Sequence, residues 1–143
     1  MASSVLHVDL ELFLTTWFRR ELAARPEAYC KNVSVVIAEP SDPAKPFPAR
    51  LLVIRWDGSS RTSALSAEAS IGLSVLAGSK TNPKDANDLA LMVQALAEKI
   101  PAVEQGNPVT DLRGSTGPFA IDEKQDRARR YLTLTLGVVG TPL

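Results

Sequence analysis

The alternation of apolar and polar positions between Ile71 and Ile100 predicts a strand followed by the best-defined helix of the chain. Ile71, Leu73 and Val75 alternate with small residues, which is the period of a strand with one buried face. After a Gly-Ser-Lys break, apolar residues recur at three- and four-residue spacings, which predicts a helix with one buried stripe. That stripe is formed by Leu89, Met92, Val93, Leu96 and Ile100.

The ends of this helix also have sequence signals. Thr81 or Asn82 is expected to cap it, with Pro83 at the first helical position. Asp85 falls in the first turn, where the helix dipole favours an acidic side chain. Pro101 is expected to end the helix.

A second helix is predicted near the N-terminus, with Asp9 as its cap and its end at about Ala24, before Pro26. Its large apolar side chains fall close to one stripe, so one side of this helix is expected to be buried against the sheet or a neighbouring subunit. The stripe contains Leu10, Phe13, Leu14, Trp17 and Leu22.

Apolar runs and alternation predict five strands in all. Two of them, Arg50–Asp57 and Glu68–Ala77, are expected to pair antiparallel, and Gly114–Pro118 is expected to be a turn-rich break. The other three strands are predicted at Val33–Ala38, Val109–Arg113 and Arg130–Val139.

The last strand has the most regular pattern. Leu132, Leu134, Leu136 and Val138 face one way, and Tyr131, Thr133 and Thr135 face the other, as in an antiparallel strand with a buried and a wetter side. The threonine side is either solvated or covered by a second subunit. The whole pattern has the order α-β-β-β-α-β-β. It predicts one α+β domain over residues 1–143, in which a mostly antiparallel sheet packs both helices on one face.

Three polar segments each have two interpretations. Glu39–Pro48 contains four prolines and is either a stiff loop or a partner-contacting loop anchored by Phe47. Ser59–Ala67 is either a flexible loop or the end of a long hairpin arm. Asp122–Arg130 mixes both charge signs and is either a solvated turn or an edge between subunits, where its arginines meet carboxylates of a neighbour.

Composition narrows the function classes. The chain has 143 residues, with 16 basic and 16 acidic side chains, so its formal net charge is zero. Strong nonspecific binding to nucleic acid needs a basic surplus, and a neutral chain that is 45% hydrophobic favours association. The longest apolar runs are too short to span a bilayer, and no signal peptide is expected at the N-terminus, which points to a cytoplasmic origin.

Candidate chemistry is sparse. The sequence contains no phosphate-binding loop, dinucleotide fingerprint, zinc-protease motif or serine-hydrolase elbow. His7 and Cys30 are the single histidine and the single cysteine, so neither a metal site nor a disulfide is expected. Asp122, Glu123 and Asp126 lie close in sequence but without the apolar surroundings that a general acid needs. No cofactor and no catalytic residue are therefore predicted.

The order of elements resembles the tail terminator (tail completion) proteins of long-tailed bacteriophages. The similarity rests on the strand Leu51–Asp57, the polar excursion Gly58–Ala67, the strand-turn-helix segment 67–101, the Gly117-Pro118 turn and a last strand ending at Gly140-Thr141. It extends from about Asp9 to Thr141. The chain departs from the family pattern in the proline-rich loop and in the dense charges after Ile121.

This resemblance implies a non-enzymatic virion protein. Members of the family form a six-membered ring at the head–tail junction that caps the tail tube, stops its polymerisation and joins the head connector. The expected partners are other copies of the chain, the tail tube protein and the connector protein. DNA would pass through the lumen without specific binding, and assembly would occur in the host cytoplasm without a membrane.

Two sets of residues are predicted to make the contacts. A contact arm toward the tail or neck contains Ser59, Ser60, Arg61, Thr62 and Ser63. A subunit interface contains Asp122, Glu123, Arg127, Arg129, Arg130, Tyr131 and Thr133. The alternatives are another phage neck, connector or minor tail protein, a small α+β nucleic-acid-binding domain with basic residues on its outer sheet face, and, as a third option, an enzyme.

Overall fold

The computed structural model describes residues 4–42 and 45–143 and shows an α+β domain built on a five-stranded sheet. The strand order is β2-β3-β4-β6-β5, and every neighbouring pair is antiparallel except the parallel pair β2–β3. A separate two-stranded sheet joins β1 to β7 near the chain ends. The strands are β1 (Val5–Leu6), β2 (Val33–Val36), β3 (Arg50–Arg61), β4 (Ser66–Ala77), β5 (Val109–Ile121), β6 (Ala128–Val139) and β7 (Thr141–Pro142).

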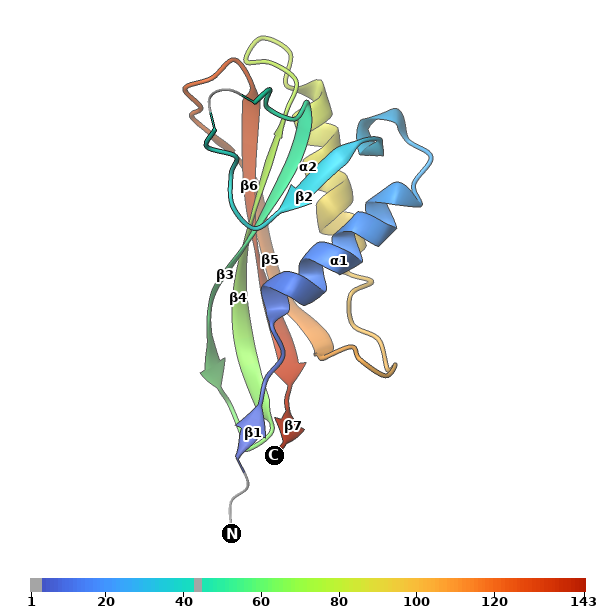
Figure 1. Cartoon of the computed structure of the whole chain (residues 1–143), viewed down its shortest axis with the longest axis vertical. Coiled ribbons are helices and arrows are strands. Elements are labelled where there is room, and N and C mark those ends of the chain that lie inside the picture. Colours follow the sequence, from blue (N-terminus) through green and yellow to red (C-terminus); the bar gives the residue numbers. More distant parts are fainter. Residues whose placement is uncertain (1–3, 43–44) are drawn as a thin grey trace.

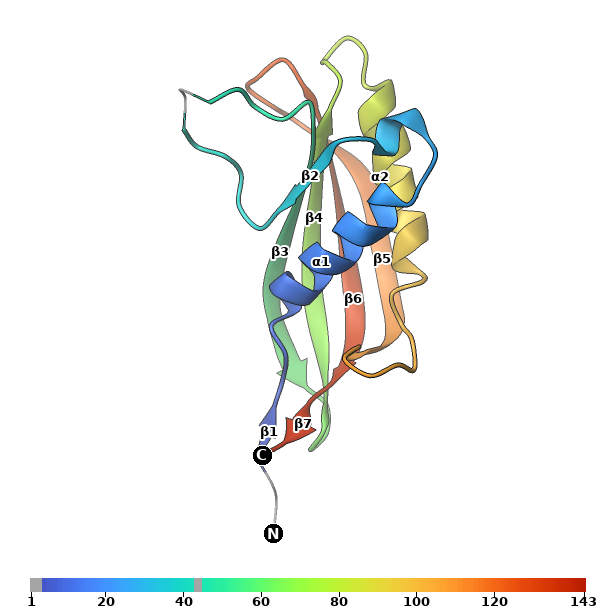
Figure 2. The same cartoon turned by 45° about the vertical axis from the view of Figure 1, so that its right-hand side comes forward.

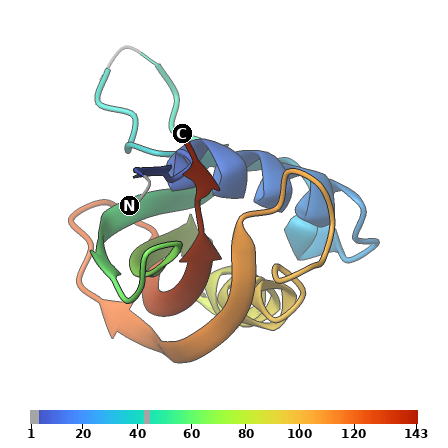
Figure 3. The same ribbon diagram turned by 90° about the horizontal axis from the view of Figure 1, so that it is seen from below.

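Both helices, α1 (Leu10–Ala23) and α2 (Lys84–Ala97), pack on the same face of the sheet (Figure 1). Helix α1 lies over β2 and β3, and α2 lies over β4, β5 and β6. Seen along the long axis, α1 lies lengthwise and α2 is viewed nearly end-on, so the two helices are not parallel (Figure 3). The predicted α+β class, the element order and the packing of both helices on one face are confirmed, with β1, β7 and a short 3₁₀ turn at Ala28–Cys30 added.

Helix α1 begins and ends as the sequence predicts. The Asp9 carboxylate accepts a hydrogen bond from the backbone N–H of Leu12 at 3.1 Å, and the helix ends at Ala23. Its apolar stripe is buried against the sheet, with Trp17 and Phe18 in edge-to-face contact at 5.0 Å between ring centroids. The buried side chains of α1 are Leu10, Leu14, Thr15, Trp17, Phe18 and Leu22.

The predicted capping of α2 is wrong in detail. Pro83 is the N-cap residue rather than the first helical residue, and it offers no side-chain acceptor. The Ser79 hydroxyl instead accepts from the backbone N–H of Asn82 at 3.1 Å, which closes a turn just before the helix. At the other end α2 stops at Ala97, and tight-turn hydrogen bonds continue the chain to Ile100 before the proline.

The alternation of β4 and β6 places one row of side chains in the main core. Leu132, Leu134, Leu136 and Val138 are buried under the helices, whereas Tyr131, Thr133 and Thr135 are half-buried on the other face. The prediction for the last strand is therefore confirmed. Because β6 lies between β4 and β5, its register fixes the relative height of both neighbours.

The expected break at Gly114–Pro118 is wrong, because these residues lie inside β5. The strand keeps its pairing with β6 by shifting register at three places, between Val109 and Asp111, Leu112 and Gly114, and Thr116 and Phe119. Gly117 has a φ of +105°, which an L side chain adopts poorly. Turn-forming residues therefore act here as bulges within a long edge strand.

The polar stretch 59–67 forms a hairpin and not a flexible loop. Strand β3 runs to Arg61, β4 starts at Ser66, and a bulge between Trp56 and Ser59 contains Gly58 at a φ of +106°. Strand β6 pairs with β4 down to Ser66, so this hairpin is the lower end of the sheet rather than a separate projection (Figure 1).

Candidate functional site

The face of the sheet opposite the helices, which we call the open face, is largely polar, with the exposed apolar Phe119 and Ile121 of β5 at its upper edge. It carries the half-buried Tyr131, Thr133 and Thr135 of β6 and charged side chains from the other three long strands. Two arginines, Arg55 of β3 and Arg113 of β5, form hydrogen bonds to other strands across this face. The side chain of each covers a glycine of the neighbouring strand.

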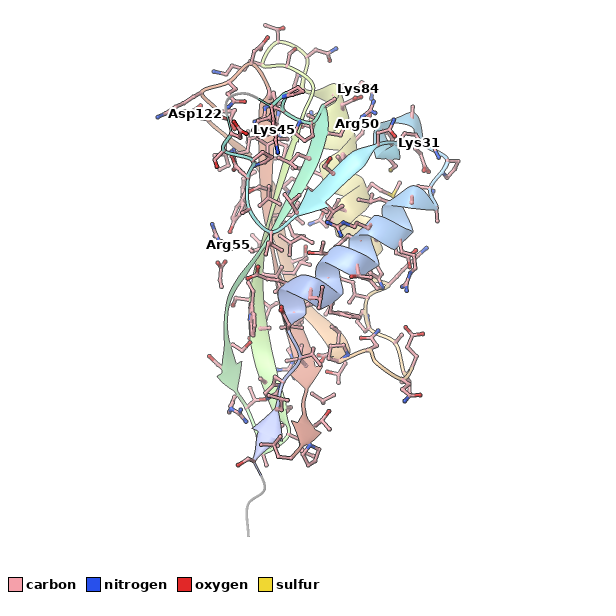
Figure 4. The ribbon with its side chains drawn as sticks, in the orientation of Figure 1. Lys31, Lys45, Arg50, Arg55, Lys84 and Asp122 are labelled. Carbon is pink, nitrogen blue, oxygen red and sulfur yellow. The ribbon has the colours of Figure 1, made fainter. Side chains whose placement is uncertain are left out.

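Arg55 crosses the open face from β3 to β6. Its guanidinium donates to Asp57 at 2.5 Å and to the Tyr131 hydroxyl at 3.0 Å. Gly72 lies between the two strands, and a Cβ there would stand 2.6 Å from the Tyr131 hydroxyl oxygen. The hydrogen bond to Asp57 raises the pKa of Arg55, so the charge is fixed and paired. In Figure 4, Arg55 projects on the side away from the helices.

Arg113 forms the second cluster. It donates to Glu68 of β4 and to Asp111 of its own strand, both at 3.1 Å, and its guanidinium covers Gly137 of β6. The hydrogen bonds that Arg113 donates to Glu68 and Asp111 raise the pKa of Arg113. The sequence prediction missed both clusters. A signal exists, because Arg55 with Asp57 and Asp111 with Arg113 are two residues apart and so share a strand face.

The upper end of the molecule is made by three loops, which we call the upper loops (Figures 1 and 2). They are formed by residues 39–42 with 45–48, by residues 78–83 and by residues 122–127. Arg129 ties two of them together, because it forms salt bridges with Glu39 at 2.6 Å and with Glu123 at 2.8 Å. The backbone N–H of Lys80 donates to Asp126 and links the third loop at 3.2 Å. In Figure 4, Lys45 and Asp122 mark two of these loops at the same end of the molecule.

The electrostatics of this network favour the charged forms. Burial opposes ionisation of Glu123, but its hydrogen bonds with Arg129 and with the backbone lower the pKa of Glu123 overall. Burial likewise disfavours the charged Arg129, yet the hydrogen bonds that Arg129 donates to Glu39 and Glu123 raise the pKa of Arg129. Arg129, Glu39 and Glu123 thus form a charge-assisted hydrogen-bond network within one chain.

Arg127 differs from the arginines beside it. It is only 8% exposed, and none of its three guanidinium nitrogens has a hydrogen-bond partner among the described residues. Its guanidinium carbon lies 3.2 Å from the centroid of the Phe47 ring, a cation–π contact with the proline-rich loop. Burial lowers the pKa of Arg127, which remains a cation near neutral pH.

The structure divides the predicted subunit interface into two places. Asp122, Glu123, Arg127 and Arg129 belong to the upper loops and to the start of β6, whereas Tyr131 and Thr133 lie on the open face. Within this set the structure brings Glu123 and Arg129 into contact. Arg130 points toward α2 instead and donates to the side-chain oxygen of Asn87 at 2.7 Å.

The predicted contact arm lies at the opposite, lower end, beside β1 and β7 (Figures 1 and 2). Arg61 donates to the backbone carbonyl of Val5 at 3.2 Å, and the Ser63 and Ser66 hydroxyls share a hydrogen bond of 2.6 Å in the tip. Ser59 accepts from the indole N–H of Trp56 at 3.1 Å. Ser60 pairs with Glu68 across the hairpin, and Thr62 pairs with Ser66 in the tip.

A groove of about 660 Å³ lies between α1 and the edge of the sheet. It is mainly apolar, and two of its lining residues, Leu12 and Ile37, are more than half exposed. Strand β2 pairs with β3 only as far as Val53, so the outer edge of β3 beyond it has no strand partner among the described residues. The backbone of this lower part of β3 is therefore an unpaired edge of the sheet, next to the groove.

Residues 4–42 and 45–143 contain no group of three or more histidine, cysteine, aspartate or glutamate side chains placed to hold a metal ion. Neither α1 nor α2, the two helices of that part of the chain, has the length and apolar character needed to cross a membrane. In comparisons with known proteins, no family model matches this sequence, and no curated protein matches it significantly.

Proposed function

We propose that this chain is a structural protein of a long-tailed bacteriophage that forms a closed ring, with six copies as the resemblance implies, at the head–tail junction. In this role it caps the tail tube, ends its polymerisation and joins the tail to the connector. The ring would assemble in the host cytoplasm and remain in the virion.

The observation that carries the proposal is the pair of unlike edges of the sheet. One edge is β5, and the other is formed by β2 and the lower part of β3. Neither edge has a further strand beside it in the described residues. Two different edges on one subunit suit head-to-tail contacts, and such contacts close into a ring when the rotation between subunits allows it.

The paired charges on the open face support the proposal that this face lines a lumen through which DNA moves without specific binding. Arg55 and Arg113, the charged donors at its centre, are each paired with carboxylates of the same chain. Paired guanidiniums attract phosphates less than free ones, because the local field is nearly neutral. We therefore propose that this face lines the ring and that the upper and lower ends meet the two axial partners.

Electron microscopy of purified particles tests the proposal directly. A ring of this protein between tail tube and connector is expected, and particles without the protein should have tails of irregular length that do not join heads. Density for the protein anywhere else in the particle, or normal tails in its absence, would refute it.

A tip variant tests the lower end. Replacing Ser63–Leu65 by a two-residue Asn-Gly turn keeps the register in which Arg61 pairs with Ala67, so it retains the paired strands β3 and β4 and shortens only the tip. The ring mass measured by light scattering should stay unchanged while capping of tails is lost. A variant that still produces tails of normal length would remove the hairpin tip from the contact arm.

A further inference from the structure

The two outer edges of the five-stranded sheet have hollows at the same level. One is the groove beside α1, which we call the α1 groove, and Trp56 of β3 lines it. The other is a hollow of about 400 Å³ beside β5, which we call the β5 groove, and Ser115 lines it. Trp56 pairs with Ile71, and Ile71 pairs with Leu134. Leu134 in turn pairs with Ser115, so one row of paired residues crosses the sheet from groove to groove.

A ring with the proposed orientation brings these two grooves together. Its axis runs along the strands, because the upper and lower ends meet the axial partners, and a rotation about that axis leaves every residue at its own height. Figure 2 shows β3 and β5 on opposite sides of the molecule. The β5 groove of one copy therefore meets the α1 groove of the next copy. Because three antiparallel pairings separate β3 from β5, these two strands run in opposite directions and their edges match as an antiparallel pair.

Bulges confine this pairing to a short segment of each strand. In β3 the register shifts after Trp56, and β2 covers the outer edge only as far as Val53. Ile54–Trp56 is therefore regular and has no strand partner on its outer side among the described residues. In β5 the register shifts on both sides of Gly114–Thr116, which is the regular segment at the same level. Two such short segments form few backbone hydrogen bonds, so side chains must select the partner.

Exposed apolar side chains line both grooves. Leu12 and Ile37 line the α1 groove, Leu91 of α2 lines the β5 groove, and each of the three is more than half exposed. Joining the grooves removes these side chains from water, and that burial stabilises the contact.

One cation and one carboxylate make the two grooves complementary in charge. Among the described residues, Arg19 is the only basic one that lines the α1 groove, and Glu98 is the only ionisable one that lines the β5 groove. Arg19 donates to the Val35 carbonyl from Nε at 3.2 Å and from Nη2 at 2.7 Å, which fixes the guanidinium and leaves further N–H donors for a carboxylate. Asp9 and Glu11 also line the α1 groove, but they lie at the N-terminus of α1, where the helix dipole stabilises them.

Glu98 stands at an unfavourable position in its own chain. It is the C-cap residue of α2, and the helix dipole disfavours a negative charge at that end. The residue is exposed and forms no salt bridge with the described residues. A cation from a neighbouring copy offsets both the dipole and the missing partner.

We propose that Gly114–Thr116 of one copy pairs antiparallel with Ile54–Trp56 of the next copy, while the Glu98 carboxylate of the first accepts hydrogen bonds from the Arg19 guanidinium of the second. The exposed apolar side chains of the two grooves are buried in the same contact. This inference rests on the proposed ring and specifies its subunit contact. Because the two grooves lie on opposite edges of one chain, the contact is heterologous and repeats around the ring.

A charge exchange tests the ion pair on the purified full-length protein, with mass followed by light scattering over a range of concentrations. Arg19→Glu and Glu98→Arg should each weaken association by roughly 10-fold or more, and the double variant should recover most of it. Glu104→Arg is the matched control, because Glu104 is also exposed and lies outside both grooves. It should change association less than about 3-fold. Single variants that associate like the wild type, or an equal loss in Glu104→Arg, would overturn the pairing.

Cross-linking tests the contact without touching the ion pair, and it decides the question if circular dichroism shows that Arg19→Glu is unfolded. Leu12→Cys and Ala95→Cys each place a thiol in one groove. A short bismaleimide should link a mixture of the two variants into dimers and leave each variant alone as monomers, because the contact is head-to-tail. The native Cys30 is buried. Dimers of either variant alone, or no dimers in the mixture, would overturn the proposal. Lys124→Cys, exposed in the upper loops, is the control partner for Leu12→Cys and should give no dimers.

The outcome is distinguishable from failure of the proposed function. A ring at the head–tail junction in which the mixed variants give no dimers would leave the proposed function intact and remove this contact. Head-to-tail dimers in a protein found elsewhere in the particle would keep the contact and remove the proposed function.

Discussion

The two ends of the molecule are held together in different ways. At the lower end the contacts are mainly backbone pairs: β1 with β7, the hairpin of β3 and β4, and the N–H of Gly140 with the carbonyl of Leu65 at 2.9 Å. At the upper end three loops meet through side chains, chiefly the carboxylates around Arg129 and the ring stacked on Arg127.

This difference has consequences for function. Backbone pairing fixes a shape whatever the side chains are, so the hairpin tip can vary while its position stays constant. Side-chain contacts between loops can be exchanged for contacts with another chain at small cost. The lower end therefore suits a preformed contact surface, and the upper end suits one that rearranges on assembly.

The largest expected effect comes from breaking the lower end. A Cβ at Gly140 would stand 2.8 Å from the carbonyl oxygen of Leu6 and would also meet the side chain of Val5. Gly140→Ala should therefore cost about 3 kcal/mol in the free energy of unfolding, the upper range for an overpacked site. Urea denaturation measures this, with Gly114→Ala as control, because a Cβ at Gly114 would come no nearer than 4.0 Å to its closest neighbour. Equal losses in both variants would show that the clash at Gly140 is relieved by relaxation.

Breaking the upper end should cost less. Arg129→Met removes two salt bridges and leaves Glu39 and Glu123 facing each other, so we expect a loss of about 2 kcal/mol. Arg20→Met, at an exposed pair with Glu21, should lose less than about 0.5 kcal/mol. If the two substitutions cost the same in thermal or urea unfolding, the Arg129 network is not what joins the upper loops.

The same network should make stability depend on pH. Because the folded state lowers the pKa of Glu123 below its ordinary 4.5, the stabilisation is complete well above pH 4.5 and is lost as pH falls through the folded pKa. Glu123→Gln should therefore flatten the acid side of the stability curve, by on the order of 1 kcal/mol. Melting temperatures measured from pH 7 to pH 3 test this, and parallel curves for the two proteins would contradict it.

The smallest effect on stability is expected at Arg127. Because its guanidinium is buried without an acceptor among the described residues, Arg127→Met should leave the unfolding free energy of the dilute chain within about 0.5 kcal/mol of the wild type, or raise it. Urea unfolding at a concentration below association measures this. A loss above about 2 kcal/mol would mean that the stack on Phe47 stabilises the free chain.

The sequence by itself determined the elements and their faces. The 3.6- and 2-residue periods locate α1, α2 and at least part of each long strand, because an element must bury the side on which its apolar residues gather. The Asp9 cap and the threonine row of β6 follow from local rules in the same way. These features depend on neighbours in sequence, and such neighbours are visible without the fold.

Only the tertiary structure decided which residues contact each other across the sheet and in the loops at its ends. The residues of Gly114–Pro118 look like a turn, yet pairing with β6 makes them bulges in β5. Arg127, Arg129 and Arg130 look equivalent in the sequence, and only long-range contacts with Glu39, Phe47 and Asn87 make them different. Strand register and loop packing join residues that are distant in the chain, so the local pattern does not contain them.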